Sequence, residues 1–157
     1  MKRYRPTYSQ WDILLADPVN PMSPEKRRHQ LTRMHIGLSA LEHDAAPTAD
    51  DWRLMSDCVN LTETLVNMGH LQDDTGLLRD AIKGLAVSGA RHVDEGLPLR
   101  LDGRGLNALR TVLASYTEAI ETLPERVMVQ AHARTERRIA DMLLRGKRSG
   151  DVVVEVS

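Results

Sequence analysis

Aromatic residues are scarce in this sequence: phenylalanine is absent, and tryptophan and tyrosine together make up only 3% of the 157 residues. The aromatics that favour strands are therefore almost missing, and Leu, Val, Met and Ala have to build the core. That composition favours packed helices and predicts an all-α protein. A chain of this length fits one domain and can bury a sufficient core without disulfides or structural metal.

Only one cysteine is present, Cys58, so no intrachain disulfide can form, which is typical of a reducing compartment. Long apolar runs are missing too. No stretch approaches the length of a membrane span, and the apolar run 13–16 is too short for the core of a signal peptide. We therefore expect a cytoplasmic protein without a membrane partner.

The net charge of −1 disfavours a whole-molecule electrostatic grip on DNA. The charge is nevertheless uneven. Residues 42–74 contain 8 acidic residues and 1 arginine, whereas residues 125–148 contain 7 basic residues and 3 acidic ones. The two segments either lie against each other in the fold or form separate solvated faces.

Proline, glycine and capping residues divide the chain into segments. Three prolines within 18–24 interrupt helix formation, so we interpret 1–24 as an N-terminal segment, with a short helix near 9–16, and a Pro-rich tether. Residues 25–157 are expected to form a single helical domain. Helical spacing of apolar residues predicts a bundle of about five helices, near 23–45, 48–69, 75–95, 106–123 and 125–144.

Two of these helices carry specific packing predictions. In the helix near 48–69 the apolar arc covers about half the circumference, which indicates a central helix with several neighbours. For the helix near 75–95, the residues predicted to face inward are Leu78, Ile82, Leu85, Ala86, Gly89, Ala90 and Val93.

The C-terminal tail, 151–157, is rich in β-branched residues and reads as a strand. Leu97, Leu99 and Leu101 alternate with other residues, so the segment 97–101 is a candidate strand that pairs with the tail. This pairing would add a small two-stranded β element to the bundle. The alternative is that the tail joins a sheet edge of another molecule, which would give a homodimer.

His132 and Glu136 are one helical turn apart in the last helix, with His132 on the apolar side. Such a pair can supply two metal ligands or an acid and a base, and His35 and His92 could complete a cluster. The sequence lacks HExxH, the Glu-x-x-His repeat of metal-binding bundles and paired cysteines. We therefore expect no metal, no cofactor and no catalytic residue, and interpret His132 as a half-buried residue bonded to Glu136 or a carbonyl.

Two further chemical candidates are weak. Cys58 lies on the apolar side of its helix, and a buried cysteine there is normally unreactive. Residues 102–105, "DGRG", precede a helix whose start could attract phosphate. They lack the lysine and hydroxyl residue that end a phosphate-binding loop, so we interpret them as a turn.

Basic residues gather in the last helix and form the candidate binding surface. They are Arg134, Arg137, Arg138, Arg145, Lys147 and Arg148. Such a surface suits either an acidic protein partner or nucleic acid. The helix-turn-helix arrangement that would favour nucleic acid is not indicated, because the turn at 69–76 is acidic.

The stretch "LPERVMVQAHARTERRIADMLLRGKRSGDVVV", residues 123–154, resembles small uncharacterised proteins of proteobacterial temperate phages and prophages. In these a Leu-Pro break leads into a helix with His followed by Thr-Glu-x-Arg, then glycine and a valine-rich end. His132, Thr135, Glu136 and Arg138 match that wording. The resemblance implies a mobile-element accessory protein that binds a host or phage macromolecule, and it implies no activity.

We therefore expect a non-enzymatic interaction protein with a protein partner. A nucleic-acid-associated regulator that uses the basic last helix is the alternative, and a metal-binding or enzymatic bundle around His132 and Glu136 is the third.

Overall fold

The computed structural model describes residues 5–149, with side chains described through Arg145. Within that range the chain forms six helices: α1 (Gln10–Leu15), α2 (Pro24–His43), α3 (Ala49–Asn67), α4 (Leu77–Glu95), α5 (Gly103–Thr122) and α6 (Glu125–Ser149). The predicted all-α bundle is confirmed for these residues. None of the helices in this range has the length and apolar content that crossing a bilayer requires.

Side-chain caps set most of the helix starts. Ser23 caps α2 with Pro24 in the first turn, and Thr48 forms a reciprocal capping box with Asp51 at the start of α3. Asp102 accepts a hydrogen bond from the Gly105 N–H at 2.7 Å, so α5 begins at Gly103 and not near residue 106.

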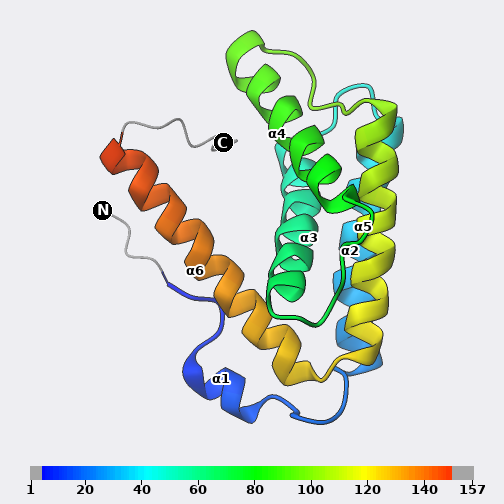
Figure 1. The fold of residues 1–157 in the computed structure, drawn as a ribbon. Coiled ribbons are helices and arrows are strands. Elements are labelled where there is room, and N and C mark those ends of the chain that lie inside the picture. The colour runs from blue at the N-terminus through cyan, green and yellow to red at the C-terminus, as the bar shows by residue number, and fades with distance from the viewer. Residues whose placement is uncertain (1–4, 150–157) are drawn as a thin grey trace.

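α3 is the central helix and packs against α2, α4, α5 and α6 (Figure 1). This confirms the prediction from its broad apolar arc. Its fully buried side chains include Met55, Cys58, Val59, Leu61 and Leu65. They meet Tyr116 and Ile120 of α5 in one continuous core, in which aliphatic and methionine side chains dominate.

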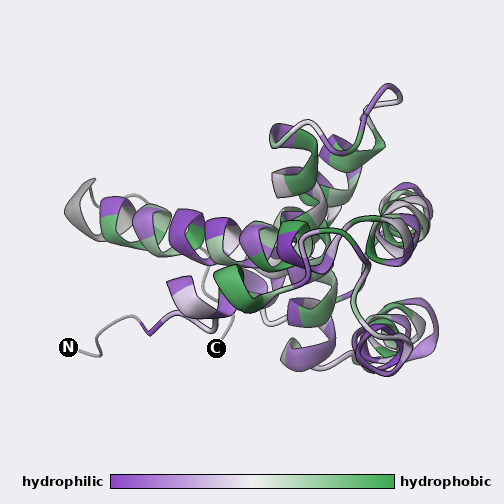
Figure 2. Ribbon diagram, turned by 90° about the horizontal axis from the view of Figure 1, so that it is seen from below, coloured by the Kyte–Doolittle hydropathy of each residue, from purple (hydrophilic) through white to green (hydrophobic). Residues whose placement is uncertain are grey.

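α6 leaves the bundle at an angle. It starts at the foot of α5, where Pro124 separates the two helices, crosses α3 and extends outward (Figures 1 and 2). Its helical backbone continues to Ser149, past residue 144, near which the sequence predicted its end. The outer half of α6 therefore projects beyond the helices that support its first half.

The predicted strand at 97–101 is wrong, since none of the described residues forms a strand. Pro98 cannot donate to a ladder, and its carbonyl accepts from Arg100 N at 2.8 Å in a tight turn. The His92 ring bonds the Leu97 carbonyl at 2.8 Å, so the backbone groups here are satisfied locally. The tail 151–157, the other half of the predicted β element, lies outside the described residues.

The inward face of α4 also differs from the prediction. Ile82 and Val93 are 37% and 57% exposed, whereas Ser88 is only 2% exposed. The buried face contains Leu78, Ala81, Leu85, Ser88 and Gly89. The apolar residues of this helix are spread around much of its circumference, so contact with α3 and α5, and not periodicity, decides which side is buried.

The N-terminal segment is fastened to the start of α6. The carbonyls of Asn20 and Asp17 accept hydrogen bonds from the Glu125 and Arg126 N–H groups at 2.8 and 2.9 Å. These N–H groups belong to the first turn of α6, which has no intrahelical partners for them. The Arg126 guanidinium in turn donates to the Ile13 and Leu14 carbonyls of α1 at 3.2 and 2.7 Å.

Candidate functional site

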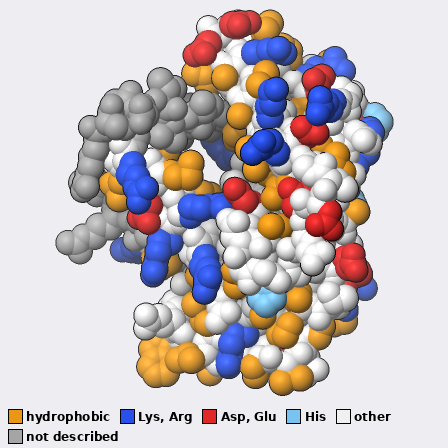
Figure 3. All heavy atoms as spheres, in the orientation of Figure 1, with side chains coloured by type: hydrophobic (Ala, Val, Ile, Leu, Met, Phe, Trp, Pro, Cys, Tyr) orange, Lys and Arg blue, Asp and Glu red, His pale blue; other side chains and the backbone are white. Residues whose placement is uncertain are grey.

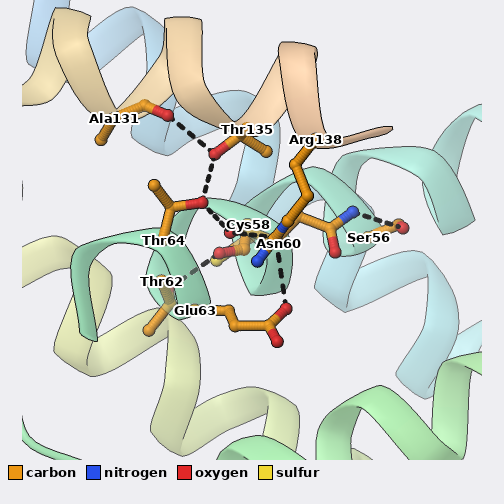
Figure 4. Close-up of polar contacts among 9 residues, drawn as sticks. All are labelled: Ser56, Cys58, Asn60, Thr62, Glu63, Thr64, Ala131, Thr135 and Arg138. Carbon is orange, nitrogen blue, oxygen red and sulfur yellow. Dashed lines mark hydrogen bonds and ion pairs between the residues drawn. The ribbon is translucent and has the colours of Figure 1, made fainter. Parts of the chain in front are cut away.

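Polar contacts anchor α6 on α3 (Figure 4). The hydroxyls of Thr135 and Thr64 lie 2.6 Å apart in the buried interface. Arg138 donates to the Asn60 carbonyl at 3.2 Å and forms a 3.2 Å ion pair with Glu63. Arg138, one of the predicted binding residues, therefore links α6 to α3.

The other predicted basic residues are placed differently. Arg134, Arg137 and Arg145 are exposed on α6, and Figure 3 shows Lys and Arg side chains following this helix. The side chains of Lys147 and Arg148 lie outside the described residues. α6 thus presents exposed arginines, whereas Arg138 is engaged with α3.

His132 lies in a pocket of about 370 Å³ where four parts of the chain meet. Thr7 and Tyr8 come from the N-terminal segment, and the remaining walls come from α2, α3 and α6. The His132 and Tyr8 rings pack edge to face with centroids 5.6 Å apart. The prediction that His132 points inward is therefore confirmed.

The sequence predicted that His132 bonds Glu136 or a carbonyl, whereas Glu136 bonds the N-terminal segment. Glu136 accepts hydrogen bonds from the backbone N–H of Thr7, at 2.9 Å, and from the Thr7 hydroxyl. The buried Nε2 atom of His132 has no hydrogen-bond partner in the described part of the chain. Glu136 therefore fastens the N-terminal segment to α6 instead of orienting the imidazole.

This pocket disfavours charge. Burial lowers the pKa of His132 below its ordinary 6.5, and nearby Glu136 only partly opposes the shift. Desolvation raises the pKa of Tyr8, which Lys26 opposes, and raises the pKa of Asp57, which Arg33 opposes. Burial in this pocket therefore favours the neutral imidazole of His132 at neutral pH.

The candidate metal cluster is not assembled. His35 is exposed on α2, and His92 is engaged with the Leu97 carbonyl far along α4. Across residues 5–145, no three histidine, cysteine or acidic side chains are grouped so that they could hold a metal ion. The fold thus separates the histidines that a metal site would have to bring together.

A surface that the sequence did not single out lies on α1 and the residues after it. Trp11 is 73% exposed, Leu14 59%, Leu15 81% and Val19 74%. No residue of α1 is buried, because polar bonds to its backbone hold it on α6 while its apolar side chains face outward. In Figure 3 hydrophobic side chains gather at the lower edge of the molecule, where α1 lies.

A usable signal for this α1 surface existed in the sequence. The helix "QWDILL" has only six residues and is separated from the bundle helices by prolines. Its large apolar residues therefore had no evident helix to pack against in the bundle. Apolar side chains that are exposed together often mark binding sites, whereas single exposed apolar residues are ordinary.

Comparison with known proteins gives no relative: no family model, curated protein or solved structure matches the chain.

Proposed function

We propose that this chain is a non-enzymatic interaction protein and that the α1 surface, formed by Trp11, Leu14, Leu15 and Val19, binds a partner protein. The observation that carries the proposal is the exposure of three large apolar side chains on α1 and of Val19 just after it, on a segment that is bonded to α6. Tryptophan is enriched among the residues that dominate binding energy at protein interfaces. A fastened helix also presents such residues with little loss of conformational entropy on binding.

The charge around this surface favours a protein over nucleic acid or an anionic membrane. Residues 9–20 contain Asp12 and Asp17 and no lysine or arginine. Both carboxylates keep depressed pKa values, because backbone N–H groups of Ser9 and of Asn20, respectively, bond to them. Lys26 and Arg126 also adjoin α1, and together with Asp12 and Asp17 they leave this surface without the cationic excess that binds phosphates, so a partner with an apolar groove is complementary to it.

The resemblance of residues 123–154 to phage proteins fits this proposal, since a mobile-element accessory protein acts by binding a host or phage macromolecule. The runner-up function, nucleic-acid binding, would use Arg134 and Arg137, which are exposed and lack ion pairs with described residues. The two proposals place the contact surface on different helices, so one set of variants separates them.

The test is affinity capture from a lysate of the native cells, with the tagged protein as bait. One half of the lysate is treated with nuclease and the other half is not. The bait is compared with the Trp11→Ala/Leu15→Ala double variant and with a matched control, Ile36→Ala/Val93→Ala, whose residues are 58% and 57% exposed elsewhere. We expect a protein that survives nuclease, binds wild type and control, and is lost from the α1 variant. With the purified partner, the α1 variant should raise Kd at least about tenfold.

Three results would overturn the proposal. One is a captured protein that binds the α1 variant as well as wild type. Another is recovery of nucleic acid that is lost with Arg134→Gln/Arg137→Gln, which promotes the runner-up. The third is a drop in the purified chain's own oligomeric mass in the α1 variant, which would make a second copy the occupant.

A further inference from the structure

A second pocket lies on the opposite side of the bundle from α1, where the middle of α4 meets the start of α5. Its volume is about 370 Å³. The helices come close because glycines face each other here: a Cβ added to Gly84 would stand 3.2 Å from the Gly105 Cα. The close approach brings the N-terminus of α5 next to the side chains of α4.

Ser88 is the informative residue in this pocket. It is 2% exposed and lines the pocket, and its hydroxyl has no hydrogen-bond partner among the described residues. Other buried or half-buried hydroxyls on helices of this protein donate to the carbonyl four residues back: Thr62, Thr64, Thr117 and Thr135. Buried hydroxyls are nearly always bonded, so the Ser88 hydroxyl points to a ligand.

The pocket is positively charged in a chain of net charge −1. Its walls carry four cations, Lys83, Arg91, Arg100 and Arg104, against two carboxylates, a balance of +2. Figure 3 shows this concentration of Lys and Arg over α4 and the residues before α5.

Both carboxylates of the pocket are already engaged. Asp80 forms an ion pair with Arg104 at 3.3 Å, and Asp102 accepts from the Gly105 N–H. Lys83, Arg91 and Arg100 form no ion pair with the described residues. Three cations are thus left to act on a ligand, and the N-terminus of the 20-residue helix α5 adds partial positive charge.

We infer that this pocket binds the phosphate group of a small phosphorylated metabolite. Lys83, Arg91 and Arg100 would hold the phosphate oxygens by charge-assisted bonds, and the Ser88 hydroxyl would donate to one of them. Val87 and Leu101 supply an apolar wall for the carbon part of the ligand. The volume lies at the lower end of the range for small-molecule pockets, which suits a compact ester better than a polymer.

The test uses the full chain in buffer of constant ionic strength, titrated with inorganic phosphate, glycerol phosphate or chloride. Binding is followed through the backbone amide resonances of Gly84, Ser88 and Gly105 by NMR. We expect saturable shifts with both phosphates, tighter binding of glycerol phosphate, and no saturation with chloride. Shifts common to all three salts would overturn the proposal. Equal affinity for inorganic phosphate and glycerol phosphate would overturn the proposal that the ligand is a phosphate ester, and would leave inorganic phosphate as the ligand.

Variants separate this site from general electrostatics. Ser88→Ala and Lys83→Gln/Arg91→Gln should each weaken phosphate binding about tenfold or more, since each removes bonds to a charged group. The matched control Arg134→Gln/Arg137→Gln removes the same charge from α6 and should bind like wild type. In phosphate-free buffer Ser88→Ala should keep or raise the Tm, because an unpartnered buried hydroxyl is deleted. Wild-type affinity in the pocket variants, or equal weakening in the control, would overturn the assignment.

Discussion

His132 and Cys58 are ionisable residues that the fold keeps uncharged. Cys58 is 1% exposed, and burial raises the pKa of its thiol to about 12. At neutral pH the thiolate is therefore almost absent, and the expectation of an unreactive core cysteine agrees with this environment. His132 differs because its ordinary pKa lies close to physiological pH, so a modest change in acidity matters to it.

The lowered pKa of His132 predicts a stability loss in acid. Between the folded pKa and 6.5 the unfolded chain binds more protons than the folded one. The contribution of the neutral imidazole to the free energy of unfolding is therefore fully present above pH 6.5 and is lost as the pH falls through the folded pKa. His132→Phe keeps a ring beside Tyr8 and cannot protonate. We expect the variant to lose less stability than wild type between pH 7.5 and 5.0, as measured by urea unfolding.

The control for this residue is His35→Gln, which alters an exposed histidine on α2. It should show the same acid sensitivity as wild type. If His132→Phe and wild type lost stability in parallel, the burial assigned to the imidazole would be wrong.

The crossing of α2 and α3 depends on the absence of a side chain at Gly37. A Cβ there would stand 3.0 Å from the Leu54 Cβ and 3.1 Å from the Asp51 carbonyl oxygen. Gly37→Ala should therefore lower the free energy of unfolding by about 1–3 kcal/mol through overpacking. Chemical denaturation checks this, with Gly103→Ala as the control.

Gly103 lies in the first turn of α5 with no atom within 4 Å of the position a Cβ would take. Because alanine favours helix, Gly103→Ala should be neutral or slightly stabilising. Equal losses at both glycines would contradict the close helix crossing.

Adjacent arginines on α6 should behave differently. Arg138→Gln removes the ion pair with Glu63 and the bond to the Asn60 carbonyl, and should cost about 1 kcal/mol, since both charges are partly screened by solvent. Arg137 is exposed, so Arg137→Gln should change stability by less than about 0.5 kcal/mol. Thermal unfolding of the two variants measures the difference in their stability. Equal losses would show that Arg138 does not hold α6 on α3.

Local sequence signals located the helices well because the signals themselves are local. The Ser23 and Thr48 caps, and the apolar periodicity of α3 and α5, act within one or two turns. The strand at 97–101 was wrong because alternating leucines carry no information about whether a ladder partner exists. The burial of Ser88 and the exposure of α1 depend on which helices meet, and periodicity along a single helix does not determine that.

The candidate sites divide in the same way. The inward direction of His132 followed from helical spacing, whereas the engagement of Glu136 by Thr7 joins residues 129 positions apart. No motif predicted that contact. Likewise, Arg137 and Arg138 are neighbouring residues of the same type. Only the position of α3 decides that Arg138, and not Arg137, forms an ion pair.

For the whole molecule, the arrangement predicts a gradient of local stability. α3 touches four other helices, whereas α6 beyond Arg138 and all of α1 lie at the periphery. Native-state hydrogen exchange should be slowest in α3, near the global unfolding free energy, and fastest in the outer half of α6. Protection of the outer α6 equal to that of α3 at every protein concentration would contradict this arrangement.

The fastening of the N-terminal segment to α6 has a consequence for the order of folding. Arg126 bonds carbonyls of α1 that precede it by 113 and 112 positions, so these contacts close a loop that spans most of the described chain. α1 is synthesised before the other described helices, whereas α6, which holds it, is synthesised only after α2 to α5. During synthesis Trp11 and Leu15 are therefore unsupported until α6 has emerged, and only then does the α1 surface take a defined shape.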